Sequence, residues 1–353
     1  MHHLDMRLFA HAAAHFAVDF SCFFALWLSA FQQASAPFWI LCYNALAFML
    51  QAPLGALLDR INDTRPATIL GCGLVAWGVL ACAFPLPCVL LLGIGNALFH
   101  AGGAVATLRQ CPQDTFAAGT YVAPGALGVA LGTLCGKGIV AFSPFSSVLL
   151  LLGCICFIWF CGAGGSPVFP VQGHPSSLEG LGTGAIMLCL ISIGVRSFAG
   201  FAVKTTEGVA APILLSACAS CLGKFGGGIV AHRVPWRVVG LLGAGIGGLM
   251  MTFFSASPAV YAGLFLFNLS MPLTLCAVMA ALPGHIGLGF GLTTLALFLG
   301  SAPLYALPNG YKAPLWLMLA TTLCSAFLLF FALRRKIGQP KQSNLRFIDR
   351  PLA

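Results

Sequence analysis

Three ionisable side chains are spaced four residues apart inside an apolar stretch near the start of the chain. The segment HAAAHFAVDF, residues 11–20, contains His11, His15 and Asp19. At 3.6 residues per turn, side chains with this spacing fall near one face of a helix. Imidazole and carboxyl groups in such a row can exchange protons near neutral pH, and they are also ligands for first-row metal ions.

The composition indicates what surrounds this row. Of the 353 residues, 59% are hydrophobic and 7% are charged, whereas soluble domains carry roughly a quarter charged residues. A helix needs about 20 apolar residues to cross a bilayer, and the short alternating segments of β-barrel strands are not present. We therefore predict an all-α integral membrane protein. The formal net charge of +9 is spread over helix ends, which does not favour nucleic acid as a partner.

Twelve apolar segments are bounded by polar residues, Pro or Gly. They lie at 8–31, 37–58, 67–84, 88–108, 116–140, 144–163, 182–203, 208–231, 238–255, 258–281, 286–307 and 313–333. The predicted inner loops and tails contain twelve Lys and Arg residues, and the outer loops contain two. Because cytoplasmic loops carry an excess of Lys and Arg, we expect a multi-pass protein of the inner (plasma) membrane with both termini in the cytoplasm.

A short pattern recurs in the two halves of the chain. GALLDR, at 55–60, aligns with GGIVAHR, at 227–233, at a shift of 173 residues. The shift places His232 where the first half has an acid, and near the same shift Asn96 falls opposite Asn268. Agreement in spacing and in span number indicates a duplication of six spans.

The duplication and a Gly, Pro and Ser-rich break predict the domain boundaries. Residues 1–163 form one six-helix bundle and residues 182–336 form the other. A cytoplasmic linker at 164–181 joins them, and a basic cytoplasmic tail follows at 337–353.

The segment GALLDR resembles the signature loop between spans two and three of the major facilitator superfamily of transporters, although the basic cluster that follows it in that family is thinned here. HFAVDF, ALFHAGG and VRSFAGF resemble a bacterial branch near the fosmidomycin-resistance-type transporters. The resemblance implies two bundles around a central cavity, lined mainly by spans one, four, seven and ten, and transport by alternating access. By the same resemblance, five residues contribute to an inner gate: Gly55, Asp59, Arg60, Gly228 and Arg233.

Depth in the membrane separates site residues from interfacial ones. At 1.5 Å per residue, Asp19 lies roughly 16 Å into span one, and His100 reaches about the same depth in span four. His15 is one turn nearer the inner surface, and His11 is close to that surface. Because a buried ionisable group costs about 2.5–3.5 kcal/mol on insertion scales, we predict that His15, Asp19 and His100 carry a coupling proton. The alternative is a polar contact that only holds helices together.

Arg196, roughly 21 Å into span seven, is the predicted anion ligand, because a guanidinium binds a carboxylate or phosphonate through two parallel hydrogen bonds. Two alternatives remain open. Arg196 pairs with an acid such as Glu207 or Asp19, and Lys224 either forms a charge pair with Glu207 or extends to the inner surface. Uncharged polar side chains near the midplane are the other expected substrate contacts: Asn96, Asn268, Ser270 and Thr274. Pro272 predicts a kink beside them.

These residues predict a monomeric secondary transporter that moves a small anionic solute with protons as the coupling ion, without a cofactor or a resident metal. A divalent metal-ion transporter that uses His15, Asp19 and His100 is one alternative, and a membrane sensor that does not transport is another. We expect neither an enzyme nor a nucleotide-driven pump, because the sequence contains no HExxH and no GxxxxGK[ST] pattern.

Overall fold

A computed structural model describes residues 6–161, 183–203, 210–305, 307 and 313–333. All regular secondary structure in these residues is helical. Eleven helical segments are long and apolar enough to cross a membrane, and α4 (Arg65–Leu80) is a shorter apolar helix of 16 residues. The predicted linker at 164–181, the predicted tail at 337–353 and Glu207 lie outside the described residues.

Six apolar segments come before residue 162. They are α1 (Met6–Leu28), the continuous segment of α2 (Ala36–Asn44), η2 (Ala45–Met49) and α3 (Gln51–Leu58), then α4, α5 (Pro85–Leu108), α6 (Thr115–Gly136) and α7 (Pro144–Cys161); a short turn, η1 (Ala30–Gln32), follows α1. Helix α1 packs against α4, α5, α6 and α7, so it lies at the centre of this half.

Six further segments follow residue 182. They are α8 (Thr183–Ala202), α9 (Ala210–Val230), the segment of α10 (Trp236–Leu241), η3 (Leu242–Gly247) and α11 (Gly248–Phe253), the broken segment of α12 (Ala259–Asn268) and α13 (Met271–Ala280), then α14 (Ile286–Tyr305) and α15 (Leu315–Ala332). Helix α8 packs against α13, α14 and α15, and α12 packs against α9, η3 and α11.

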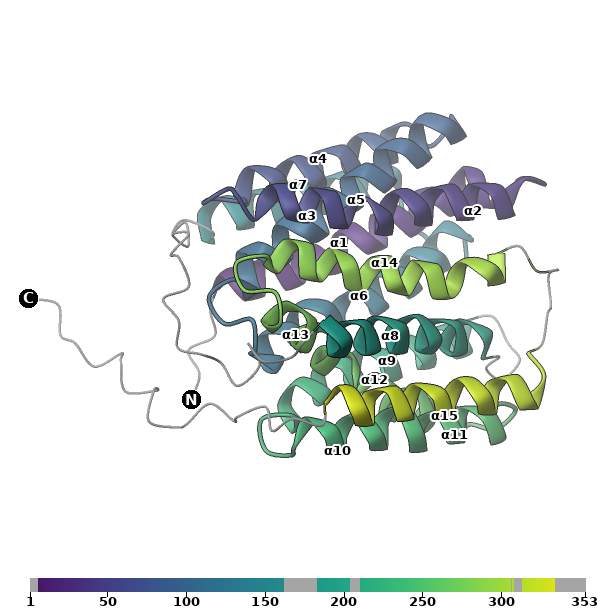
Figure 1. Cartoon of the computed structure of the whole chain (residues 1–353). Helices are drawn as coiled ribbons and strands as arrows, with labels where there is room; N and C mark the ends of the chain where they lie inside the picture. Colours follow the sequence, from purple (N-terminus) through teal and green to yellow (C-terminus); the bar gives the residue numbers. More distant parts are fainter. Residues whose placement is uncertain (1–5, 162–182, 204–209, 306, 308–312, 334–353) are drawn as a thin grey trace, which may run out of the picture.

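Helices α6 and α14 make most of the contacts between the two halves. Helix α6 packs against α9, and α14 packs against α3 and α5. In Figure 1 most N-terminal helices (purple to blue) lie above most C-terminal helices (green to yellow), with α14 and α6 between them. This arrangement is consistent with the predicted pair of six-helix bundles.

The third predicted span was too long. We expected it at 67–84, but α4 ends at Leu80 and residues 81–84 form a turn. Phe84 has an extended backbone (φ −120°, ψ 106°) because it precedes Pro85, and the residue before a proline is disfavoured in the helical region. Pro85 then begins α5 three residues before the predicted start of the fourth span, at a position where a missing N–H is harmless.

The tenth span has the predicted irregularity, as a break between α12 and α13 at residues 269–270. Pro272 occupies the first turn of α13, where its missing N–H leaves the end of α12 without a continuing hydrogen bond. Two π-helical segments, η2 and η3, interrupt the second and ninth spans. The sequence analysis did not predict them, and π-helical turns are frequent near functional sites.

Candidate functional site

Helix α1 carries the polar row that the sequence predicted. His11 and His15 are buried and Asp19 is partly buried. His11 does not join the other two, because its Nδ1 bonds the carbonyl oxygen of Arg7 at 2.8 Å, one turn earlier on the same helix. His15 and Asp19 are therefore the members of the row that can interact with each other.

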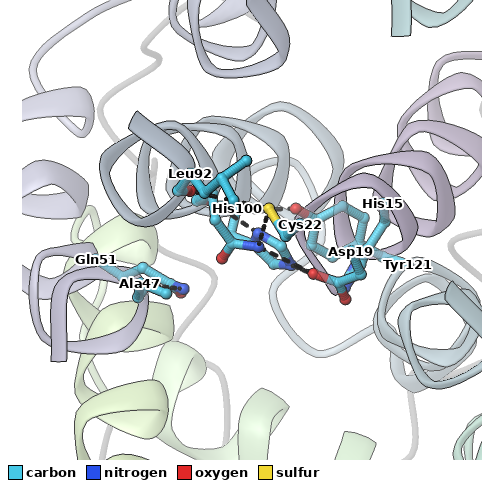
Figure 2. Close-up of polar contacts among 9 residues, drawn as sticks. His15, Asp19, Cys22, Ala47, Gln51, Leu92, His100 and Tyr121 are labelled. Atoms are coloured by element: carbon cyan, nitrogen blue, oxygen red, sulfur yellow. Dashed lines mark hydrogen bonds and ion pairs between the residues drawn. The ribbon is translucent and has the colours of Figure 1, made fainter. Parts of the chain in front are cut away.

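His100 of α5 joins this pair, so three ionisable groups from two helices meet. His15 Nε2 lies 2.9 Å from His100 Nε2 and 3.3 Å from Asp19 Oδ2. His100 Nε2 lies 3.6 Å from Asp19 Oδ1. Figure 2 shows these side chains of α1 and α5 pointing toward one another. Spans one and four thus bring together the groups whose depths matched in the sequence, and we call His15, Asp19 and His100 the triad.

Asn96 orients two members of the triad. Its side-chain amide donates to Asp19 Oδ1 at 3.0 Å, and its backbone carbonyl oxygen lies 2.8 Å from His100 Nδ1. We predicted Asn96 as a substrate contact, and the structure places it against the triad. One residue therefore fixes both the carboxylate and the second imidazole ring.

This geometry assigns the protons of the two imidazoles. A carbonyl oxygen only accepts, so the His100 Nδ1 bonded to Asn96 must carry a hydrogen. In neutral His100 the Nε2 is then an acceptor, and the contact of 2.9 Å with His15 Nε2 requires the hydrogen on His15. Two hydrogens cannot share that contact. A further proton at His100 Nε2 would break the contact, whereas a proton at His15 Nδ1, which has no hydrogen-bond partner among the described residues, would leave it in place.

Helix α6 leaves space for the triad and holds it from one side. A Cβ atom at Gly125 would lie 2.5 Å from both Asp19 Oδ2 and His15 Nε2. Tyr121 donates its hydroxyl hydrogen to the His100 carbonyl oxygen at 3.0 Å, and its ring packs edge-on to His15. The sequence analysis gave neither residue a role. Gly125 follows Pro124 in the sequence, but glycines are too common in packed membrane helices for this one to stand out.

Lys224 brings a positive charge to the triad from the other half. It lies on α9, which packs against α6, and it interacts electrostatically with Asp19 and His100. The sequence suggested Glu207 as a partner of Lys224, but Glu207 lies outside the described residues. Within the described part of the chain, Asp19 is the carboxylate with which Lys224 interacts.

Arg196 forms a second polar group in the C-terminal half. Its side chain is buried, with 7% exposure. One terminal nitrogen donates to Ser270 Oγ, and the other donates to Thr274 Oγ1 at 2.8 Å. Its Nε has no hydrogen-bond partner among the described residues. The break between α12 and α13 exposes the two hydroxyls to the guanidinium, so three of the predicted substrate contacts come together.

No carboxylate in the described part of the chain forms an ion pair with Arg196. Asp19, one of the two acids suggested for that pair, is engaged by His15, His100 and Asn96. A buried guanidinium without a counter-ion is unfavourable, and an incoming anion would stabilise it.

Asn268 does not join the Arg196 group. Its amide donates to the Leu264 carbonyl oxygen at 2.8 Å and to Ser220 Oγ at 3.4 Å, and Ser220 lies on α9. The side chain therefore points from α12 toward α9. We predicted Asn268 as a substrate contact, and the structure places its amide apart from Ser270 and Thr274, because the helix break follows Asn268 and changes the direction of the later residues.

The predicted gate residues lie at the end of the molecule where α1 begins and α15 ends, which we call the inner face. Gly55 and Gly287 are in backbone contact across the two halves, and a Cβ at Gly287 would lie 2.5 Å from the Gly55 carbonyl oxygen. Asp59 accepts hydrogen bonds from the N–H groups of Gly287 and Leu288 at 2.7 and 3.0 Å. An acid from the first half thus caps the N-terminus of α14.

Gly228, the predicted counterpart of Gly55, makes the matching contact between α9 and α6. Its carbonyl oxygen accepts from Thr115 Oγ1 at 3.0 Å, and a Cβ at Gly228 would lie 2.5 Å from the Thr115 carbonyl oxygen. The two glycines of the repeated pattern therefore both lie where the halves touch.

The arginines of the pattern lie outside these contacts. Arg60 and Arg233 are exposed, and neither side chain has a hydrogen bond or ion pair to the residues that the structure describes. Arg109, at the end of α5, donates to the carbonyl oxygens of Leu58, Ile61 and Asn62. It stabilises the turn that presents Asp59, as a cation near the end of α3 should.

Comparisons with known proteins identify the fold. No family model matches the sequence, and no curated protein matches it. The fucose:proton symporter FucP of E. coli has a similar solved structure, with a TM-score of 0.65 and 14% identity over 94% of this chain and 98% of that chain. The human organic anion transporter MFSD10 (TETRAN) also has a TM-score of 0.65, with 18% identity over 94% of this chain and 99% of that chain.

A second structure of FucP, described as a major facilitator superfamily transporter in the outward conformation, has a TM-score of 0.58 and 14% identity, and it covers 92% of this chain and 98% of that chain. The chain is thus a multi-pass membrane protein with the fold of the major facilitator transporters. At these identities the likeness concerns the fold, and the narrower resemblance to fosmidomycin-resistance-type transporters stays a prediction.

Proposed function

We propose that this protein is a secondary transporter that moves a small anionic solute by alternating access. The observation that carries the proposal is the buried guanidinium of Arg196, which has hydroxyl partners but no carboxylate partner in the described residues. A guanidinium in that state favours a ligand with a carboxylate, phosphonate or phosphate group. Transport by a proton symporter and by an organic anion transporter of the same fold supports this class of function.

The anion contact is tested with reconstituted full-length protein and a panel of small carboxylates, phosphonates and phosphates. We expect uptake of at least one of these anions. Arg196→Lys keeps the charge but loses the planar fork, and Arg196→Gln loses both, so the substrate concentration for half-maximal uptake should rise in the order wild type, Lys, Gln. Equal values in all three proteins would assign Arg196 to helix packing with Ser270 and Thr274.

We propose that the coupling ion is a proton held at the triad. A further proton at His15 Nδ1 would place a positive charge on a ring that contacts both His100 of α5 and Asp19 of α1. Protonation is thereby linked to the packing of α1 on α5, and Lys224 extends the electrostatic link to α9. A proton arriving at the triad therefore alters contacts within one half and between the two halves, as a coupled carrier requires.

A divalent metal ion is a second candidate cargo at the same place. One ligand atom from each member of the triad lies within 4.8 Å of the others, and ligand atoms of one tetrahedral zinc ion are about 3.4 Å apart. Uptake of Zn²⁺ or Mn²⁺ into vesicles, measured with a metal-sensitive dye, distinguishes the candidates. Metal uptake that is lost in His100→Gln but unaffected by Arg196→Gln would favour metal transport over anion transport.

We further propose the setting predicted from the loop charges: a monomer in the inner (plasma) membrane, with both termini and the inner face in the cytoplasm. Reporter fusions at the two termini test the orientation. A periplasmic or external reporter signal at either terminus would overturn it. Light scattering of the purified protein tests the oligomeric state, and a dimer mass would contradict the proposal.

A further inference from the structure

The two places where the halves meet at the inner face are built differently. At one of them, Asp59 of the first half accepts from the N-terminal N–H groups of α14 in the second half. At the other, α6 of the first half carries its own acid. Asp114 precedes α6 and accepts hydrogen bonds from the N–H groups of Phe116 and Ala117 at 2.9 and 3.1 Å.

The second half contributes an imidazole to that acid. His232 follows α9, and its Nε2 lies 3.3 Å from Asp114 Oδ1, with both side chains partly exposed (34% and 25%). In the repeated pattern, His232 occupies the position of Asp59. In the first half, the residue at this position, Asp59, caps α14 of the other half. In the second half, the residue at this position is His232, which pairs with Asp114, the acid that caps α6 of the other half.

The replacement changes how the contact responds to pH. A carboxylate that caps a helix loses its charge only in strong acid, whereas an imidazole changes charge near pH 6.5. Burial raises the pKa of Asp114, but hydrogen bonds from His232 and from the N–H of Ala117 outweigh it and hold the pKa below the ordinary 3.8. Asp114 is thus charged throughout the physiological range, and the charge of the pair is set by the imidazole.

In the described part of the chain, the ionisable groups that interact with Asp114 or lie beside His232 in sequence keep their charge state in this range. The thiols of Cys111 and Cys276 interact electrostatically with Asp114, and thiols are neutral below about pH 8. Arg233, next in sequence, is exposed and permanently charged. Arg237 of α10 lies over the ring of Phe330, at 3.4 Å from its centroid, and is also permanently charged.

We propose that His232 and Asp114 form a pH-dependent latch between α9 and α6 at the inner face. Protonated His232 attracts the Asp114 carboxylate more strongly than neutral His232 does, so the latch should be stronger at low pH and weaker at high pH. An acidic inner compartment should therefore hold this face closed, and an alkaline one should let it open. The consequence for transport rests on the proposed alternating access, but the contact itself can be measured without a substrate.

Hydrogen exchange of the full-length protein in nanodiscs, read by mass spectrometry at pH 5.5, 6.5, 7.5 and 8.5, tests the latch. After correction for intrinsic exchange, protection of peptides covering 115–121 and 225–232 should fall about threefold between pH 5.5 and 8.5, the scale of a partly exposed ion pair. The peptide covering 286–290, which contacts Asp59, should not change and serves as an internal reference.

Three variants make the test specific. His232→Gln and Asp114→Asn should give low protection without pH dependence, and His232→Arg should give high protection at every pH, because its charge is permanent. PH-independent protection in the wild type would overturn the latch, as would a wild-type pH dependence in His232→Gln. If Asp114→Asn unfolds because α6 loses its cap, the comparison of the Gln and Arg variants at position 232 still decides the question.

Discussion

Gly125 offers a way to disturb the triad without changing any of its ionisable groups. In Gly125→Ala the new methyl carbon would lie 2.5 Å from Asp19 Oδ2 and from His15 Nε2. Ordinary contact begins near 3.4 Å, so about 0.9 Å of movement is needed. The triad is enclosed by three packed helices, and overpacking of such a site costs about 1–3 kcal/mol.

Thermal unfolding in detergent, followed by tryptophan fluorescence, measures this cost. At about 2–4 °C per kcal/mol, the midpoint of Gly125→Ala should fall by about 2–12 °C relative to the wild type. Gly73→Ala is the matched control, because a Cβ at Gly73 of α4 meets nothing within 4 Å. Its midpoint should stay constant or rise, since alanine favours the helix by up to about 1 kcal/mol.

Equal midpoints for the two variants would refute this part of the argument. They would mean that α6 shifts away from α1 without strain, and that Gly125 does not fix the distance between Asp19 and His15. A lower midpoint that is also seen in Gly153→Ala, another glycine with open space around it, would show a general effect of alanine in these helices instead of a clash with the triad.

Three further predictions concern contacts outside the triad. Asp59→Asn should reduce hydrogen-exchange protection at the start of α14, since a neutral amide caps a helix N-terminus less strongly than a carboxylate does. Asp63→Asn, in the loop that follows, should leave this protection unchanged. Equal protection in the two variants would remove Asp59 from the inner gate. Arg109→Ala should lower the unfolding midpoint by the equivalent of about 1–3 kcal/mol, because three carbonyl oxygens lose their donor, and an unchanged midpoint would contradict that role. Lys137→Met should change the midpoint by the equivalent of less than about 1 kcal/mol, because the ammonium lies over the Trp27 ring at the exposed end of α6; a larger loss would mean that Lys137 has a role beyond this contact.

The local part of the site followed from the sequence. Spacing alone placed His15 and Asp19 on one helical face, and a constant rise per residue matched Asp19 with His100 at the same depth. The sequence also named Arg196, Ser270 and Thr274 as substrate contacts, and the structure brings the three side chains together. These inferences succeeded because a membrane fixes the direction and the depth of each helix, so few arrangements remained.

Contacts that depend on rotation about a helix axis could not be predicted in this way. The depth of Asn268 did not show that its side chain faces Ser220, because the break between α12 and α13 changes the direction in which neighbouring side chains point. Neither did depth show that Asn96 contacts two members of the triad. His232 and Asp114 are 118 positions apart in the sequence. Their pairing depends on the packing of α6 against α9, which the pattern of either helix alone does not predict.

The central claim is that the triad couples a proton gradient to solute movement, and Asp19→Asn tests it most directly. The substitution keeps the size of the side chain and its hydrogen bond from Asn96 but removes the carboxylate. In proteoliposomes, accumulation of the transported anion driven by a pH gradient should vanish in Asp19→Asn, while counterflow exchange without a gradient should persist, because the rocking motion itself does not need the proton. Accumulation with the pH dependence of the wild type in this variant would contradict the account and leave the triad as a polar contact that packs α1 against α5.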